Sequence, residues 1–175
     1  MADLNMVSLV LLQQHGLPGS KADTLAELLR SSWQQECGEN HIICREGEPG
    51  DELWVLAEGS VRVTKKDFLN SAQDLAVIPA PAVLGLVSLV DGGKRSAGLV
   101  ADDTCSFITI DRKRFDALME GRDEQSQTFR KLLVASLSRQ LSRGRASLRN
   151  VLREARGVDE LSVSAGELQA DSWRQ

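Results

Sequence analysis

The chain has 175 residues, a formal net charge of −4, and 26% charged residues. This length suits one domain with some additional helix, and it is enough to bury a core without disulfide staples. The ordinary apolar and charged content argues against global disorder, and the small negative charge gives no overall sign of a nucleic-acid-binding protein.

Two helices are predicted before the middle of the chain. Residues 4–14 have helical character and end at a strong breaker, Gly16 to Gly19, which includes a proline. Residues 21–35 form the second predicted helix, because three of its leucines have helical spacing. Ser20 is a suitable N-cap for it.

From residue 41 short apolar runs alternate with turn residues at intervals of about 8–12 residues, which is typical of a β-roll or sandwich. A short helix over residues 86–90 is the one expected interruption. The glycines at three tight turns, Gly47, Gly50 and Gly59, are expected to need positive φ. The expected strands are residues 41–44, 53–57, 61–64, 75–78, 97–101 and 105–110.

The C-terminal third is predicted to be helical, with a short helix over residues 112–119 and a long one over 124–156. In the long helix, apolar or small residues recur at alternating spacings of three and four, which indicates a heptad seam. The seam favours a homodimer, and the alternative is a helix packed on its own domain without a dimer. The seam consists of Val134, Leu137, Leu141, Gly144, Leu148, Val151 and Ala155.

The same helix is strongly basic, with a single acidic residue, Glu154, between residues 130 and 156. The simpler interpretation is a solvated face beside the seam. The alternative is a surface for an acidic partner or for nucleic acid. The basic residues are Arg130, Lys131, Arg139, Arg143, Arg145, Arg149, Arg153 and Arg156.

The β region resembles the cyclic-nucleotide-binding family, which includes bacterial cAMP receptor proteins and the regulatory subunits of cyclic-nucleotide-dependent kinases. The resemblance implies an α+β fold, with a β-roll flanked by N-terminal helices and a long C-terminal dimerisation helix. The expected regions are N-terminal helices over 1–37, the β-roll over 38–117, C-terminal helices over 118–156 and an acidic tail over 157–175. The residues that carry the resemblance are Gly38, Ile42, Ile43, Glu46, Gly47, Gly50, Asp51, Leu53 to Leu56, Gly59 to Val63, Ile108 to Asp111 and Phe115.

Residues 84–97 resemble the family's phosphate-binding cassette, whose usual form is Phe-Gly-Glu, a short helix, and then Arg followed by a small residue and Ala. In such a cassette, helix N–H groups and the arginine bind a cyclic phosphate. The resemblance also places Gly144 and Arg145 about where related bacterial receptors cover the ligand base. The implied ligand-binding residues are Gly85, Leu86, Val87, Ser88, Arg95, Ser96 and Ala97.

The cassette departs from the family at Leu86, where the family has the glutamate that accepts a hydrogen bond from the ribose 2′-hydroxyl. The loss of that acceptor predicts binding of cAMP or cGMP that is roughly tenfold to several-hundredfold weaker. One hypothesis is therefore a dimeric adaptor with a degenerate site, in which Arg95 pairs with a nearby carboxylate. The alternative is a sensor in which Gly85 to Val90 and Arg95 bind a cyclic nucleotide or another phosphate ligand, and the C-terminal helix moves.

Catalysis and metal binding are not expected. The sequence suggests no nucleophile–base pair and no P-loop or dinucleotide fingerprint, and His15 and His41 are too far apart to propose a metal site. Its three cysteines, Cys37, Cys44 and Cys105, are odd in number and are expected to be reduced thiols of a cytoplasmic protein.

No apolar stretch approaches the roughly 20 residues that span a bilayer. About 19 residues follow Arg156, too few for the winged-helix DNA-binding domain of about 70 residues in the family's transcription factors. The expected output is contact with a protein that the sequence does not identify, for which the tail residue Trp173 is a candidate anchor.

Overall fold

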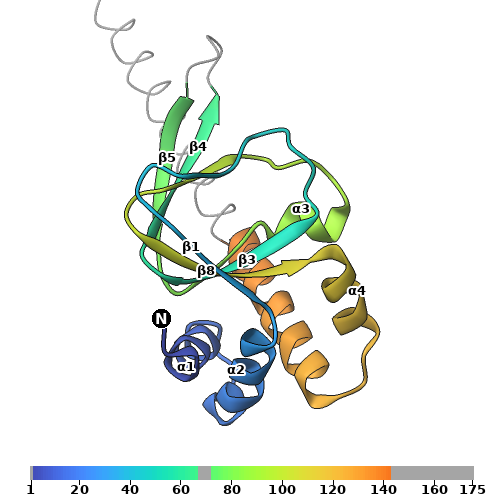
Figure 1. Ribbon diagram of the computed structural model, residues 1–175. Coiled ribbons are helices and arrows are strands. Elements are labelled where there is room, and N and C mark those ends of the chain that lie inside the picture. The colour runs from blue at the N-terminus through green and yellow to red at the C-terminus, as the bar shows by residue number, and fades with distance from the viewer. Residues whose placement is uncertain (1, 67–71, 143–175) are drawn as a thin grey trace, which may run out of the picture. The chain divides into compact units, whose positions relative to one another are not determined.

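The structure is a computed structural model, and it describes residues 2–66 and 72–142 of the chain (Figure 1). The chain divides into two compact units, Met1–Leu137 and Ser138–Gln175. The second unit is described only over residues 138–142, which are helical. The predicted end of the long helix and the predicted acidic tail lie outside the described residues.

The N-terminal region contains two α-helices, α1 (Leu4–Gln14) and α2 (Ala22–Arg30), with a short 3₁₀ helix, η1 (Gly19–Lys21), between them. The first confirms the prediction for residues 4–14. Its N-cap is Asp3, whose carboxylate accepts from the backbone N–H groups of Asn5 and Met6. The prediction of Ser20 as the second N-cap was wrong, because η1 includes that residue and α2 begins after it.

The second predicted helix was also too long. The hydroxyls of Ser31 and Ser32 donate to the carbonyl of Leu28, and α2 ends at Arg30. The chain then forms strand β1 (Trp33–Cys37), which pairs antiparallel with β8 (Cys105–Asp111). Long-range strand pairing thus overrides local helical preference, and the region 1–37 predicted as helical ends in a strand.

The β-roll consists of two antiparallel sheets with the orders β1-β8-β3-β6 and β2-β7-β4-β5. All six predicted strands are present with shifted ends. Strand β6 was missed because it has only three residues and follows Pro79-Ala80-Pro81, a sequence typical of a loop. The remaining strands are β2 (Ile42–Cys44), β3 (Glu52–Glu58), β4 (Ser60–Lys66), β5 (Ala72–Pro79), β6 (Ala82–Leu84) and β7 (Gly98–Ala101).

The turn glycines follow the prediction in two of three cases. Gly47 and Gly59 have φ of 85° and 87°, as expected. Gly50 has no positive φ, so that expectation was wrong. Position 50 instead has no room for a side chain, because a Cβ there would lie 2.4 Å from the Cβ of Ser88.

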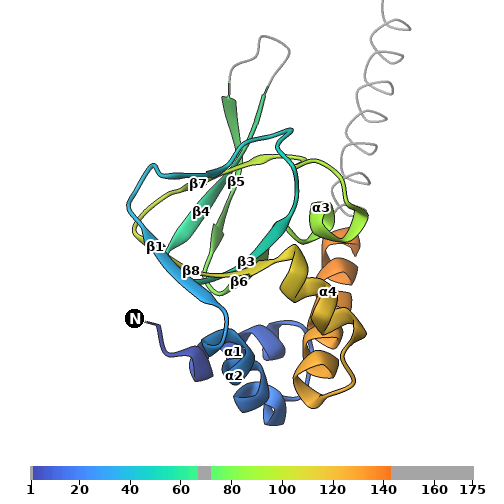
Figure 2. The ribbon, with the colours of Figure 1, turned by 45° about the vertical axis from the view of Figure 1, so that its right-hand side comes forward.

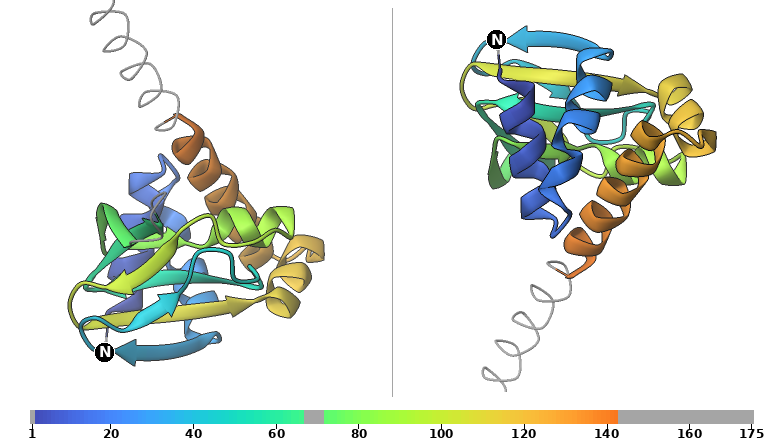
Figure 3. Two further views of the ribbon diagram at one scale, coloured as in Figure 1. Left: turned by 90° about the horizontal axis from the view of Figure 1, so that it is seen from above. Right: turned by 90° about the horizontal axis from the view of Figure 1, so that it is seen from below.

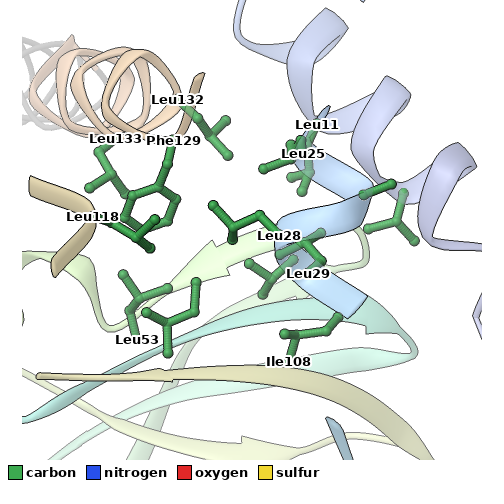
Figure 4. Close-up of a cluster of buried hydrophobic side chains, with 14 of the residues drawn as sticks. Leu11, Leu25, Leu28, Leu29, Leu53, Ile108, Leu118, Phe129, Leu132 and Leu133 are labelled. Atoms are coloured by element: carbon green, nitrogen blue, oxygen red, sulfur yellow. The ribbon is translucent and has the colours of Figure 1, made fainter. Parts of the chain in front are cut away.

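The apolar core has two parts. One cluster fills the space between the sheets and includes Trp54, Leu56, Val61 and Phe107. The other lies between the sheet β1-β8-β3-β6 and the helices that cover it. Figures 2 and 3 show these helices against one side of the β-roll. Leucines of α2 and of the C-terminal helix meet side chains of β3 and β8 there (Figure 4).

Two helices follow the last strand. The prediction for residues 112–119 is confirmed by α4 (Arg112–Glu120). The C-terminal helix begins at residue 124 and is described as far as residue 142. Arg130 of this helix donates from Nη1 to the carbonyls of Leu118, Met119 and Gly121, at 2.8, 3.0 and 2.6 Å. The arginine therefore satisfies the open carbonyl end of α4 and ties the two helices together.

Candidate functional site

The candidate site is built around Gly85, which joins β6 to the short helix α3 (Leu86–Asp91). Gly85 is the N-cap of α3 and has a φ of 72°. A Cβ at this position would lie 2.6 Å from Nη1 of Arg95 and 2.9 Å from Cζ3 of Trp54. Both the backbone conformation and the space therefore require glycine here.

Arg95 is the polar centre of the site, and its side chain is turned inward, with 6% of the residue exposed. Nη1 donates to the carbonyl of Gly85 at 3.0 Å and to Oγ of Ser88 at 2.9 Å. Nη2 donates to the carbonyl of Glu52 at 2.7 Å. The structure thus brings together Gly85, Ser88 and Arg95 from the predicted set and adds the backbone of β3.

Trp54 forms one wall of this arrangement. The guanidinium carbon of Arg95 lies 4.3 Å from the centre of the Trp54 ring, which is a stacked cation–π contact. The sequence prediction placed Trp54 in a strand but gave it no part in the site. The signal that could have found it is the alternation in that strand, which places Trp54 and Leu56 on one face, toward the space between the sheets.

Arg95 is a buried cation whose hydrogen-bond acceptors are all uncharged groups. Burial lowers the pKa of the Arg95 guanidinium, and the nearby Cys44, Glu52 and Asp51 oppose that shift. Within the described residues, Arg95 forms no ion pair and Nε is buried without an acceptor. The predicted pairing of Arg95 with a carboxylate is therefore replaced by hydrogen bonds to two carbonyls and a hydroxyl.

The turn between β2 and β3 holds the backbone of Arg95 in place. The backbone N–H of Arg95 donates to the carbonyl of Glu48, and Gly47 donates to the carbonyl of Arg95, both at 2.8 Å. Gly50 likewise donates to the carbonyl of Gly93. These bonds link residues 45–51 to residues 93–95, which are far apart in the sequence.

Leu86 does not join this polar group. Only 1% of Leu86 is exposed, and it belongs to the cluster beneath the helices, with Leu53, Leu89 and Phe129. Of the other predicted residues, Val87 and Ser96 are exposed and Ala97 is half-buried. No polar contact to Arg95 comes from any of these within the described residues.

The predicted dimer seam is only partly described. Val134 and Leu141 are exposed, by 68% and 71%, whereas Leu137 is half-buried against the core. The side of the helix that packs on the domain instead carries Phe129, Leu132 and Leu133. The remaining seam positions, Gly144, Leu148, Val151 and Ala155, and the predicted base-covering Arg145 lie outside the described residues.

Among residues 2–66 and 72–142, none of the helices combines the length and the apolar character that a membrane span requires. No group of three or more histidine, cysteine or acidic side chains is placed there to hold a metal ion.

The site thus consists of a β-roll with a glycine of positive φ, a short helix and a buried arginine stacked on Trp54. The profile of the cyclic nucleotide-binding domain matches residues 34–122. The chain belongs to this family.

The curated relatives are longer proteins, and this chain matches only a part of each. A cyclic nucleotide-gated potassium channel of Mesorhizobium japonicum is 30% identical over 61% of this chain and 28% of its own length. The cGMP-dependent protein kinase of Caenorhabditis elegans is 27% identical over 71% of this chain and 16% of its own length. A CRP-like cAMP-activated transcriptional regulator of Mycobacterium tuberculosis is 24% identical over 69% of this chain and 54% of its own length. The chain therefore spans about half or less of each.

Solved structures agree on the fold. The Thermus thermophilus catabolite activator protein aligns with a TM-score of 0.66 and 25% identity, over 81% of this chain and 62% of its own. A cyclic nucleotide-binding domain from Methylobacillus flagellatus aligns with a TM-score of 0.69 and 23% identity, over 86% of this chain and 83% of its own. The predicted β-roll with flanking helices is confirmed.

Proposed function

We propose that this chain is a non-enzymatic regulatory domain of the cytoplasm that acts through protein contacts and binds cAMP or cGMP weakly or not at all. The observation that carries the proposal is the burial of Leu86 in the apolar cluster beneath the helices. The position that would hold the ribose-binding carboxylate supplies packing instead.

The state of Arg95 supports the same proposal. Its N–H groups already donate to the Gly85 carbonyl, the Ser88 hydroxyl and the Glu52 carbonyl. The buried guanidinium is also stacked on the ring of Trp54. A ligand phosphate would have to compete with these partners or use the rest of the guanidinium. The arginine thus has a structural role, linking α3 to β3, that does not depend on a ligand.

A second candidate function is a weak sensor of a phosphate ligand. The observation that favours it is Nε of Arg95, which is buried without an acceptor. An unpaired buried donor is unfavourable, and a phosphate oxygen would satisfy it. In this candidate, Gly85 to Val90 and Arg95 hold the phosphate, and the hinge for the C-terminal helix lies between Phe115 and Gln127.

Calorimetric titration with cAMP, cGMP and a cyclic dinucleotide separates the two candidates. We expect no binding at micromolar concentrations, because the acceptor for the ribose hydroxyl is missing. The same titration is made with Arg95→Lys, which keeps the charge but loses the forked donors of the guanidinium. Lys94→Ala is the control, because the side chain of Lys94 is exposed.

A dissociation constant in the micromolar range or tighter would overturn the proposed adaptor function. If Arg95→Lys then abolished the binding and Lys94→Ala kept it, the sensor would be the correct assignment. Binding that both variants retain would also contradict the proposal and would place the ligand away from Arg95.

The protein contacts are proposed to include a homodimer through the C-terminal helix. Its support is Val134, a large apolar side chain that is 68% exposed at a seam position. A charge introduced into such a seam is unfavourable, because it would be desolvated against the partner helix.

We therefore expect the full chain to be a dimer by light scattering, and Val134→Glu to weaken dimerisation by at least tenfold. Lys131→Glu, an exposed position one turn earlier on the same helix, is the matched control for added negative charge. A monomeric wild type, or equal dissociation in both variants, would rule out the seam as the interface.

A further inference from the structure

Two of the three cysteines lie directly opposite each other on neighbouring strands. In the antiparallel pairing of β1 with β8, Cys37 is the register partner of Cys105. Side chains of directly opposed residues point to the same face, with Cβ atoms about 4.5–5.5 Å apart. The sequence, with 67 residues between the two positions, gives no sign of this proximity.

The two thiols lie close enough to interact. Burial raises the pKa of the Cys37 thiol, and hydrogen bonding to the backbone and side chain of Cys105 opposes that rise. Cys105 is 1% exposed and forms part of the cluster between the sheets, against which Cys37 is packed. Sγ of Cys105 also lies 3.1 Å from the carbonyl of Ser60.

The backbone distance suits a covalent link. Opposed residues of an antiparallel pair have Cα atoms about 4.5 or 5.5 Å apart, and disulfides span about 4.4–6.8 Å. Both cysteines are reduced in this structure. Forming a bond between the sulfurs therefore requires rotation of the side chains and no rearrangement of the strands.

We propose that Cys37 and Cys105 are a peroxide-reactive pair that forms an intramolecular disulfide. Hydrogen peroxide oxidises the sulfur of Cys37 to sulfenic acid, releasing one water after proton transfer. The sulfur of Cys105 then attacks the sulfenic sulfur, the C–S–O–H group loses its oxygen as a second water, and the S–S bond forms. Two thiols and one peroxide give one disulfide and two waters.

The surroundings assign the two roles. Cys37 is half-buried on β1, an edge strand of its sheet, so peroxide reaches its sulfur first. Cys105 is shielded and acts as the resolving thiol. Burial raises the pKa of both thiols, so both are mainly protonated at neutral pH and the reaction is slow.

Cys44 is the natural control. It is buried in β2, which belongs to the other sheet and pairs with β7. Its register partners are therefore not cysteines. Cys44→Ser should leave the proposed reaction intact, whereas Cys37→Ala or Cys105→Ala should prevent it.

The experiment treats the reduced full chain with hydrogen peroxide, blocks the remaining thiols with an alkylating agent, and measures intact mass and disulfide-linked peptides. We expect the wild type and Cys44→Ser to lose two hydrogens within one chain, with a Cys37–Cys105 peptide link. We expect their melting temperatures to rise by several degrees after oxidation and to return on reduction, because the link closes a long loop.

Three results would overturn the proposal. The first is a disulfide that involves Cys44, and the second is a disulfide that forms only between chains. The third is oxidation of Cys37 to sulfinic acid while Cys105 remains a free thiol and is alkylated. The wild-type peptide map decides among these without any variant, so a folding defect in Cys105→Ala does not obscure the answer.

Discussion

Leu86→Glu is expected to lower the free energy of unfolding by about 3–5 kcal/mol, because it places a carboxylate in the apolar cluster without a partner. Leu86 is 1% exposed among Leu53, Leu89 and Phe129, and that cluster offers no donor for a charge. Urea-induced unfolding followed by circular dichroism measures the effect. The variant therefore should not restore the family's ribose site, although it restores the family's residue.

Val87→Glu provides the matched control on the same short helix. Val87 is 46% exposed, so its replacement should change the free energy of unfolding by only about 0.5 kcal/mol. Equal stability of the two variants would show that the side chain at position 86 can turn out of the core. A gain of cAMP or cGMP affinity in Leu86→Glu would then argue for an intact sensor geometry.

The pH dependence gives an independent readout of the same variant. Burial raises the pKa of the introduced carboxyl above its unfolded value of about 4.3. Between the unfolded pKa and the higher folded pKa, the folded state keeps a proton that the unfolded state has lost. Stability therefore falls as pH rises through this range. The deficit of Leu86→Glu relative to the wild type should therefore be smaller at pH 5 than at pH 8.

Gly85→Ala is expected to have the second largest effect, a loss of about 2–4 kcal/mol in the free energy of unfolding. Part of the loss is backbone strain, because φ at this position is 72°. The rest is steric, because the new methyl group would lie 2.6 Å from Nη1 of Arg95 and 2.9 Å from the Trp54 ring. The methyl group must displace the guanidinium from the ring or move α3.

Gly92→Ala separates the two contributions. Gly92 is the C-cap of α3 with a similar φ of 69°, but a Cβ there would meet nothing within 4 Å. Its loss should be limited to backbone strain of about 1–2 kcal/mol. Tryptophan fluorescence should change in Gly85→Ala and not in Gly92→Ala, since only the former disturbs the contact between Arg95 and Trp54.

Equal losses in the two glycine variants would show that the methyl group at position 85 causes no steric destabilisation. The result would mean that Arg95 and Trp54 adjust to the methyl group at no cost. The close packing around Gly85 would then make no measurable contribution to the free energy of unfolding.

The candidate site was predictable in composition and only partly in geometry. The spacing of Gly85 and Arg95 in the sequence was enough to place them together, because family resemblance fixes the order of strand, turn and helix around them. The partners of Arg95 were not predictable. Two of its three acceptors are backbone carbonyls, of Gly85 and Glu52, and main-chain atoms leave no trace in the residue pattern.

Three features could be predicted from the residue pattern alone: the alternation of short strands and turns, the extent of α1 and α4, and the glycine at the start of α3. These depend on local periodicity and on residues whose backbone preferences are strong. Tertiary structure decided that Trp33–Cys37 is a strand, because its helical alternative could not pair with β8. It also decided that Leu86 packs under the helices, that Arg95 stacks on Trp54, and that Cys37 meets Cys105. Each of these depends on which faces of distant segments come together, and a one-dimensional pattern does not contain that information.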